Sequence, residues 1–296
     1  MDLFLNEYVD IAISRIQKFA KIAAAMDLQP ALGFSGGKDS IVCYELCKRA
    51  GIDFSAYFNR AFESAVTVKF IHDNFPDVIE RKLINCGFFG NIKKNHNGML
   101  PTAQIAYCCK DFKHNSKLID KCSIVGVRAA ESNKRRTRKA LSFKNERVRK
   151  KIDYKEYFTE NCVASGAPNL LQLSPIIDWS TEMVWDFINN NNLPINPEYE
   201  HGYERIGCMI CPKSNFARNV KRLYEFPKLV KSLIKIRKEG NCDWIITSDN
   251  KDYKDDKIYY ICRYLNYSFA PFSKKQQKLY EDFREWFDKQ NIIINP

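Results

Sequence analysis

The run Ser35-Gly36-Gly37-Lys38-Asp39-Ser40 places glycines, hydroxyls, a lysine and a carboxylate within six residues. Glycines allow a tight turn and leave backbone N–H groups uncovered, while the hydroxyls and the lysine add further donors. The apolar run at 30–34 predicts a short buried strand before the turn, and the run at 41–47 predicts an amphipathic helix after it. Because a helix begins with partial positive charge, this turn is expected to bind a phosphate group.

Two pairs of cysteines form a second candidate site. Cys108 and Cys109 are adjacent, whereas Cys208 and Cys211 have two residues between them in a turn. Four thiolates suit an iron–sulfur cluster, and adjacent ligands are unusual for zinc, so we expect a cluster, with zinc or no metal as alternatives. Buried thiols are the sufficient interpretation for most of six further cysteines: Cys43 and Cys47, which lie one helical turn apart after the phosphate-binding turn, and Cys122, Cys162, Cys242 and Cys262, which lack partners at ligand spacing.

A basic segment at 134–151 contains ten lysines or arginines and one acid, so it carries +9 of the net charge of +12. A polyanion such as nucleic acid would be attracted there through release of its counterions. A solvated or disordered loop is the alternative. If nucleic acid binds, the expected contacts are Arg135, Arg136, Arg138 and Lys139.

Strands and helices must alternate to position these residues. Strands are predicted at about 30–34, 54–58, 78–83, 123–127 and 171–179, and helices at about 2–25, 39–49, 64–74, 109–119 and 181–190. Residues 86–106 are expected to form an irregular surface loop. The alternation predicts a parallel, twisted α/β sheet with helices on both faces, followed by helices at about 216–238 and 274–289.

Composition and length bound the class of protein. With 296 residues and 45% hydrophobic content, the chain can bury one sizeable core with a smaller appended unit. We expect a nucleotide-binding domain over 1–215, which includes the N-terminal helix and the cysteines, and a helical region over 216–296. No apolar run long enough to span a membrane and no secretory signal is evident, so a cytoplasmic protein without a membrane partner is expected.

The phosphate-binding turn resembles the PP-loop of the ATP pyrophosphatases, a family that splits ATP between its α and β phosphates. Leu32 and Asp39 depart from the commoner phosphate loop of kinases, which needs glycine and then Ser or Thr at those positions. The segment 126–132, Gly-Val-Arg-Ala-Ala-Glu-Ser, resembles the Gly-x-Arg-x-x-Glu-Ser element of the PAPS reductase branch. The cysteine pairs resemble the arrangement by which adenylyl-sulfate reductases hold a [4Fe–4S] cluster. The resemblance spans about residues 30–215.

This resemblance implies the roles of individual residues. ATP and Mg²⁺ would bind at 35–40 and at Arg128, with Lys38, Asp39 and Arg128 catalytic. Arg128, at the end of a strand, would face the phosphate or sulfate end of the nucleotide. The four paired cysteines would hold a [4Fe–4S] cluster.

The chain departs from the reductases in one respect: the final 34 residues contain neither Cys nor His, so their Glu-Cys-Gly-x-His segment is missing. Its features are closest to the ATP pyrophosphatase subunit of DNA phosphorothioation systems. We therefore expect adenylation of nucleic acid, DNA rather than RNA, with sulfur from a cysteine desulfurase and possible homo-oligomers. A sulfonucleotide reductase, a tRNA thiolation enzyme and a non-catalytic nucleotide- or nucleic-acid-binding subunit are the alternatives.

Overall fold

A computed structural model of the chain describes residues 3–113, 121–151, 154–155, 163–164, 170–239, 256–266 and 271–290. The chain divides into two compact units, each formed by segments that are far apart in the sequence. Unit 1 comprises Met1–Arg60, Ser64–Leu83 and His114–Gly207. Unit 2 comprises Ala61–Glu63, Ile84–Lys113 and Cys208–Pro296.

Unit 1 is built on a seven-stranded sheet with the order β3-β2-β1-β4-β7-β5-β6. Every neighbouring pair is parallel except β5 and β7. The predicted α/β class with a mainly parallel sheet is therefore confirmed. The strands are β1 Ala31–Gly33, β2 Ser55–Asn59, β3 Ile79–Arg81, β4 Cys122–Ile124, β5 Leu141–Phe143, β6 Val163–Ala164 and β7 Leu171–Leu173.

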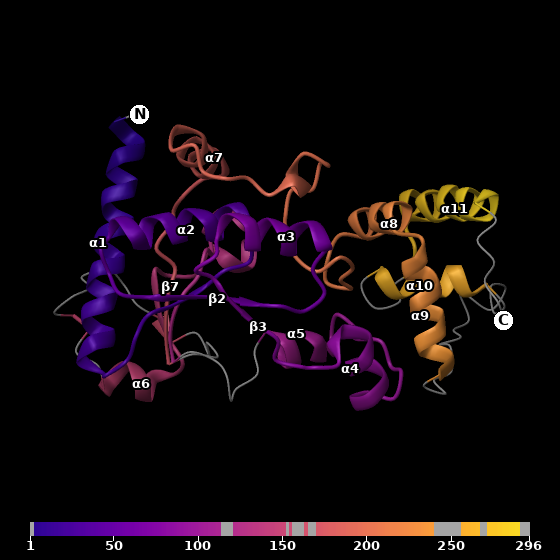
Figure 1. Ribbon diagram of the computed structural model, residues 1–296, viewed down its shortest axis with the longest axis horizontal. Coiled ribbons are helices and arrows are strands. Elements are labelled where there is room, and N and C mark those ends of the chain that lie inside the picture. The colour runs from indigo at the N-terminus through magenta and orange to yellow at the C-terminus, as the bar shows by residue number, and fades with distance from the viewer. Residues whose placement is uncertain are drawn as a thin grey trace. The chain divides into compact units, whose positions relative to one another are not determined.

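Helices cover this sheet, and Figure 1 shows α2 and α3 running along one side of the strands. The helix predicted at the N-terminus is present, and it packs against α2 and β7 through buried residues such as Ile16 and Phe19. Ser180 caps α7, because its hydroxyl accepts from the Met183 N–H. The helices are α1 Leu3–Ala25, α2 Lys38–Arg49, α3 Ala65–Asn74, α6 Glu146–Lys151 and α7 Thr181–Asn190, with 3₁₀ turns η1 Ala129–Glu131, η2 Asn133–Arg135 and η3 Pro197–Tyr199.

Helices are the only regular elements among the described residues of unit 2, which has its own apolar core. That core includes Phe88, Phe112, Leu223, Ile261 and Phe283, all of which are buried. Four of the helices pack on one another, as Figure 1 also shows: α8 Phe216–Glu225, α9 Lys228–Glu239, α10 Lys257–Leu265 and α11 Lys274–Lys289. The remaining two are α4 Gly87–Asn95 and α5 Tyr107–Phe112.

Some of the sequence expectations are wrong or incomplete. The surface loop expected over 86–106 contains α4, in which Phe88 and Ile92 lie one helical turn apart and are both buried. The helix expected over 216–238 is divided into α8 and α9, because Pro227 has no N–H and cannot continue a helix. The helix expected over 109–119 is α5, and residues 114–120 lie outside the described residues.

The basic segment is not simply a loop. It contains β5, whose three residues are all buried in the sheet, and the short helix α6. The alternative of a wholly solvated loop is therefore wrong. Among the described helices of the chain, none is both long and apolar enough to cross a membrane.

Candidate functional site

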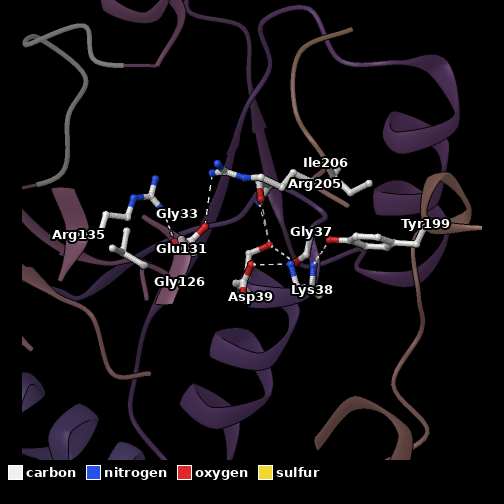
Figure 2. Close-up of a pocket in the computed structure, with 13 residues that line it drawn as sticks. Gly33, Gly37, Lys38, Asp39, Gly126, Glu131, Arg135, Tyr199, Arg205 and Ile206 are labelled. Atoms are coloured by element: carbon white, nitrogen blue, oxygen red, sulfur yellow. Dashed lines mark hydrogen bonds and ion pairs between the residues drawn. The ribbon is translucent and has the colours of Figure 1, made fainter. Parts of the chain in front are cut away.

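The predicted phosphate-binding turn follows β1, the strand at which the strand order of the sheet reverses. From β1 the chain proceeds to β2 on one side, while β4 pairs with the other side of β1. Ligands of open α/β sheets bind at the carboxyl ends of the strands at such a switch point. A cavity of about 170 Å³ opens there, and Figure 2 shows Gly33, the last residue of β1, and Gly126, after β4, among the residues that line it.

Two glycines make the turn possible. Gly36 has a φ of 70°, and a Cβ there would lie 2.9 Å from Ile71. A Cβ on Gly126 would lie 2.8 Å from the carbonyl carbon and oxygen of Asp39. The segment after β4 therefore packs directly on the first turn of α2, where any side chain would displace the backbone. Within the turn, Ser40 Oγ accepts from the Ser35 N–H and donates to the Gly37 carbonyl.

Asp39 joins two cations at this point. Its Oδ1 accepts from Arg128 Nε at 2.6 Å, and its Oδ2 lies 3.4 Å from Lys38 Nζ. Arg128 is only 2% exposed, and its Nη1 also donates to the Trp179 carbonyl and to Thr181 Oγ1, both at 3.3 Å. The structure thus brings together three residues that the sequence placed in one site. An entering phosphate would compete with Asp39 for both cations.

A second carboxylate, Glu131, organises the other side of the cavity. It accepts from the Arg128 backbone N–H, forms an ion pair with Arg135 and lies 3.4 Å from Arg205 Nη2. Burial opposes ionisation of Glu131, but the Arg128 N–H and the two guanidinium groups outweigh burial and lower its pKa. Arg135, which the sequence assigned to a nucleic-acid surface, lines this cavity, as Figure 2 shows.

Tyr199 completes the site and was not predicted from the sequence. Its hydroxyl accepts from the Lys38 N–H at 2.9 Å, so it provides a partner for a backbone donor at the start of α2. Asn196 caps η3 and donates its side-chain N–H to the Gly36 carbonyl at 3.2 Å, which holds this segment against the turn. Burial raises the pKa of Tyr199, so its hydroxyl stays protonated at neutral pH. The only sequence signal for Tyr199 and Arg205 was their place in the stretch before Cys208.

The basic turn, defined as residues 136–139, connects η2 to β5. Arg136, Arg138 and Lys139 are exposed there. The turn is held at both ends, since the Arg138 N–H donates to the Arg135 carbonyl and the Ala140 carbonyl accepts from Ser174. Three of the four residues predicted to contact nucleic acid therefore project from a fixed turn that begins next to the cavity lining.

The two cysteine pairs lie in unit 2. Cys108 and Cys109 stand in α5, and the charges of Cys208 and Cys211 both act on Cys108. A hydrogen bond from Cys108 lowers the pKa of Cys109 to about 6, with help from Lys113 and Lys213. Burial raises the pKa of Cys208 to about 11. This set of four thiols has the chemistry that a [4Fe–4S] cluster requires.

The thiols are neighbours, but they are not gathered into a coordination site. Within the described part of the chain, no three His, Cys, Asp or Glu side chains are arranged to hold a metal ion. Asn219 fixes the second pair through hydrogen bonds with the Cys211 N–H and carbonyl. Of the other thiols, Cys43, Cys47, Cys122 and Cys262 are buried as expected, whereas Cys162 and Cys242 lie outside the described residues.

Comparison with known proteins gives the family. Residues 29–214 match the phosphoadenosine phosphosulfate reductase domain. An uncharacterised protein of Methanocaldococcus jannaschii is 30% identical over 215 residues, 67% of this chain and 39% of that protein. The adenosine 5′-phosphosulfate reductase of Lysinibacillus sphaericus is 41% identical over 46 residues, which is 16% of this chain and 20% of that protein.

Among solved structures, the PAPS reductase of Candida auris in complex with phosphate matches with a TM-score of 0.45 and 13% identity, over 65% of this chain and 87% of that chain. The chain spans about half or less of the length of the curated relatives that it matches over most of its own length. The family match covers β1, the phosphate-binding turn, Arg128 and all four paired cysteines. The chain therefore belongs to the phosphoadenosine phosphosulfate reductase domain family, within the PP-loop superfamily.

Proposed function

We propose that the chain is an ATP pyrophosphatase that adenylates an acceptor for sulfur transfer. The observation that carries this proposal is that Lys38 and the start of α2 line the cavity at the switch point of the sheet, where Asp39 holds the buried Arg128 beside them. These groups provide two fixed cations and a helix N-terminus for the phosphates of ATP. Preorganised charge of this kind stabilises the negative charge that develops on a departing pyrophosphate.

Each residue has a distinct role in this proposal. Lys38 neutralises the pyrophosphate, and Arg128 binds the phosphate at the acceptor side. Asp39 exchanges part of its contact with these cations for Mg²⁺, which in nucleotide sites is commonly held by one or two carboxylates and the phosphates themselves. Mg²⁺ supplies further neutralisation of the triphosphate.

The proposed acceptor is a backbone phosphate of nucleic acid, DNA rather than RNA. Its oxygen attacks the α-phosphorus of ATP, and pyrophosphate leaves. Sulfide, derived from a cysteine desulfurase and a reductant, then attacks the backbone phosphorus, and AMP leaves with the oxygen that was activated. The basic turn supports this acceptor, because its exposed cations lie directly after residues that line the ATP cavity.

We also propose that Cys108, Cys109, Cys208 and Cys211 hold a [4Fe–4S] cluster. When bound, such a cluster supplies a redox-active centre. The chemistry of the four thiols and their mutual electrostatic contact support this proposal.

Product analysis tests the proposed reaction. Protein purified without oxygen is incubated with ATP, Mg²⁺ and in turn no acceptor, DNA or tRNA, and the nucleotides are separated by chromatography. AMP and pyrophosphate are expected, with the highest yield in the presence of DNA. ADP with phosphate would contradict the PP-loop reaction, a higher yield with tRNA would favour tRNA thiolation, and no turnover would favour a non-catalytic subunit.

The nucleic-acid part is tested separately. Replacing Arg136, Arg138 and Lys139 by Ala should weaken DNA binding and flatten its salt dependence, by about 0.9 in log–log slope for each duplex phosphate that is no longer neutralised. A matched control changes Lys274, Lys275 and Lys278 of α11, which are exposed cations in unit 2. If the basic-turn variant binds DNA as the parent does at every salt concentration, the proposed binding of nucleic acid by this turn is contradicted.

A sulfonucleotide reductase is the second candidate, because the chain has local similarity to adenosine 5′-phosphosulfate reductases. Arg128 would then face a sulfate in place of a phosphate. Release of sulfite from adenosine 5′-phosphosulfate in the presence of a dithiol reductant would support this candidate over the first.

A further inference from the structure

A second cavity of about 540 Å³ adjoins the phosphate-binding turn. Its size is that of a site for a small molecule or a single nucleotide. It shares Lys38, Glu131, Tyr199 and Arg205 with the smaller cavity, so a ligand in one would lie directly beside a ligand in the other. The phosphate-binding turn lines the smaller cavity, whereas Trp185 and Tyr203 line only the larger one.

The larger cavity has an aromatic wall. Trp185 of α7 is half-buried, and its ring meets Tyr199 edge-on with centroids 5.1 Å apart and planes at 83°. Tyr199 is fixed by its hydrogen bond to the Lys38 N–H, and Tyr203 is buried beside the same cavity. A rigid aromatic wall of this kind provides a face on which a planar ring can stack.

The cavity also has cationic groups at two depths. Arg128 is buried, with its guanidinium fixed by Asp39, Trp179 and Thr181. Arg205 is 64% exposed at its side chain and lies within 3.4 Å of Glu131, which orients it. A phosphate held between these arginines would lie next to Lys38 and therefore next to the proposed ATP.

We propose that this larger cavity binds one unstacked nucleotide of a single-stranded nucleic acid, with its base on Trp185 and its phosphate at Arg205. The inference rests on the proposed function and names the place of its acceptor. A base within a duplex is stacked on both faces, so it would have to leave the helix before it could reach Trp185. Single-stranded substrate avoids that cost. The exposed cations of the basic turn would hold the neighbouring phosphates.

Binding of a defined oligonucleotide tests the inference without ATP. The parent protein is titrated with an eight-residue single-stranded DNA, and tryptophan fluorescence and anisotropy of a labelled strand are recorded. Because stacking of one base contributes about 1–3 kcal/mol, Trp185→Ala should weaken binding by about tenfold or more. Trp185→Phe should retain most of the affinity but lose the fluorescence change. Arg205→Ala should weaken binding and reduce the salt slope by about 0.7.

Controls separate this site from other causes. Trp286→Phe alters a tryptophan of unit 2 that packs on Tyr224 and Phe283, so it should leave the fluorescence change and the affinity intact. Thermal unfolding of each variant checks that it folds. If Trp185→Ala does not fold, Trp185→Phe still decides the matter, because a persistent fluorescence change would place the base elsewhere.

Three results would overturn the inference: Trp185→Ala binding the strand as the parent does, duplex DNA binding as tightly as single-stranded DNA with the same dependence on Trp185, or AMP alone displacing the strand from Trp185. The last would assign the cavity to the adenosine of ATP. Failure of the proposed function can be distinguished from failure of this inference. In that case the parent protein forms no AMP and pyrophosphate but still binds the strand through Trp185.

Discussion

The buried pair of Asp39 and Arg128 allows stability and activity to be separated. Asp39→Asn removes the charge that faces Arg128 Nε at 2.6 Å, while the guanidinium, 3% exposed at the side chain, keeps hydrogen bonds to Trp179 and Thr181. Breaking a fully buried pair costs about 3–5 kcal/mol. Since the Asp39 side chain is 18% exposed and Arg128 keeps neutral partners, we expect a loss of about 2–3 kcal/mol, or about 4–10 °C in Tm.

The double variant is the informative control. Arg128→Met leaves Asp39 with Lys38 as a remaining cationic partner at 3.4 Å, so it should cost less than Asp39→Asn. Replacing both charges should bring stability to within about 1 kcal/mol of the parent, because an apolar replacement of a buried ion pair is often neutral. ATP cleavage should be lost in all three variants. Urea unfolding followed by circular dichroism measures the stabilities. A double variant no more stable than Asp39→Asn would refute the pairing argument.

Three further changes probe other parts of the structure. Gly126→Ala places a Cβ 2.8 Å from the Asp39 carbonyl, so it should cost about 1–3 kcal/mol in urea unfolding and reduce ATP affinity; parent-like values would contradict the close packing. The lowered pKa of Glu131 contributes stability that is present above its unfolded pKa of about 4.3 and lost as the pH falls through its folded pKa; Glu131→Gln should therefore have a lower Tm than the parent at pH 7, and the difference should disappear only as the pH falls through the folded pKa, below the unfolded value. Cys108→Ser should abolish the brown colour and the iron content of anaerobically purified protein, whereas Cys86→Ser, at a half-exposed thiol outside the two pairs, should not; a colourless parent with stoichiometric zinc would contradict the cluster.

Much of unit 1 could be predicted because its signals are local. The phosphate-binding turn is a contiguous motif between an apolar strand and an amphipathic helix, and both elements are present as β1 and α2. Helices α1 and α11 follow from apolar residues at helical spacing. Ser180 could be recognised as a cap from its place before an apolar run.

Unit 2 could not be predicted in the same way, because it is assembled from distant segments. Residues 61–63 belong to it although they follow a strand of unit 1, and the Phe62 carbonyl accepts from the Met209 N–H. Helix α10 was not predicted, since its run of Tyr, Ile and Cys is buried on all sides and shows no helical alternation. Helix α4 was hidden by its glycines at 87 and 90.

The charged residues of the candidate site could also be predicted only in part from the sequence. Lys38, Asp39 and Arg128 were recognisable because each lies in a short motif. Glu131 lies within a motif and only four positions from Arg135, but its ion pair with Arg205 depends on how η1 and the segment after η3 meet. Pairing between residues about 70 positions apart leaves no local pattern in the sequence.

The most direct test of the central claim follows an oxygen atom. A single-stranded oligonucleotide with ¹⁸O at both non-bridging positions of every backbone phosphate is incubated with the protein, ATP, Mg²⁺, a cysteine desulfurase, cysteine and a reductant, and the AMP released is examined by mass spectrometry. Adenylation of the backbone predicts AMP that carries one ¹⁸O, since the activated oxygen departs with it. AMP without ¹⁸O, formed in the same yield whether or not the oligonucleotide is present, would contradict the account.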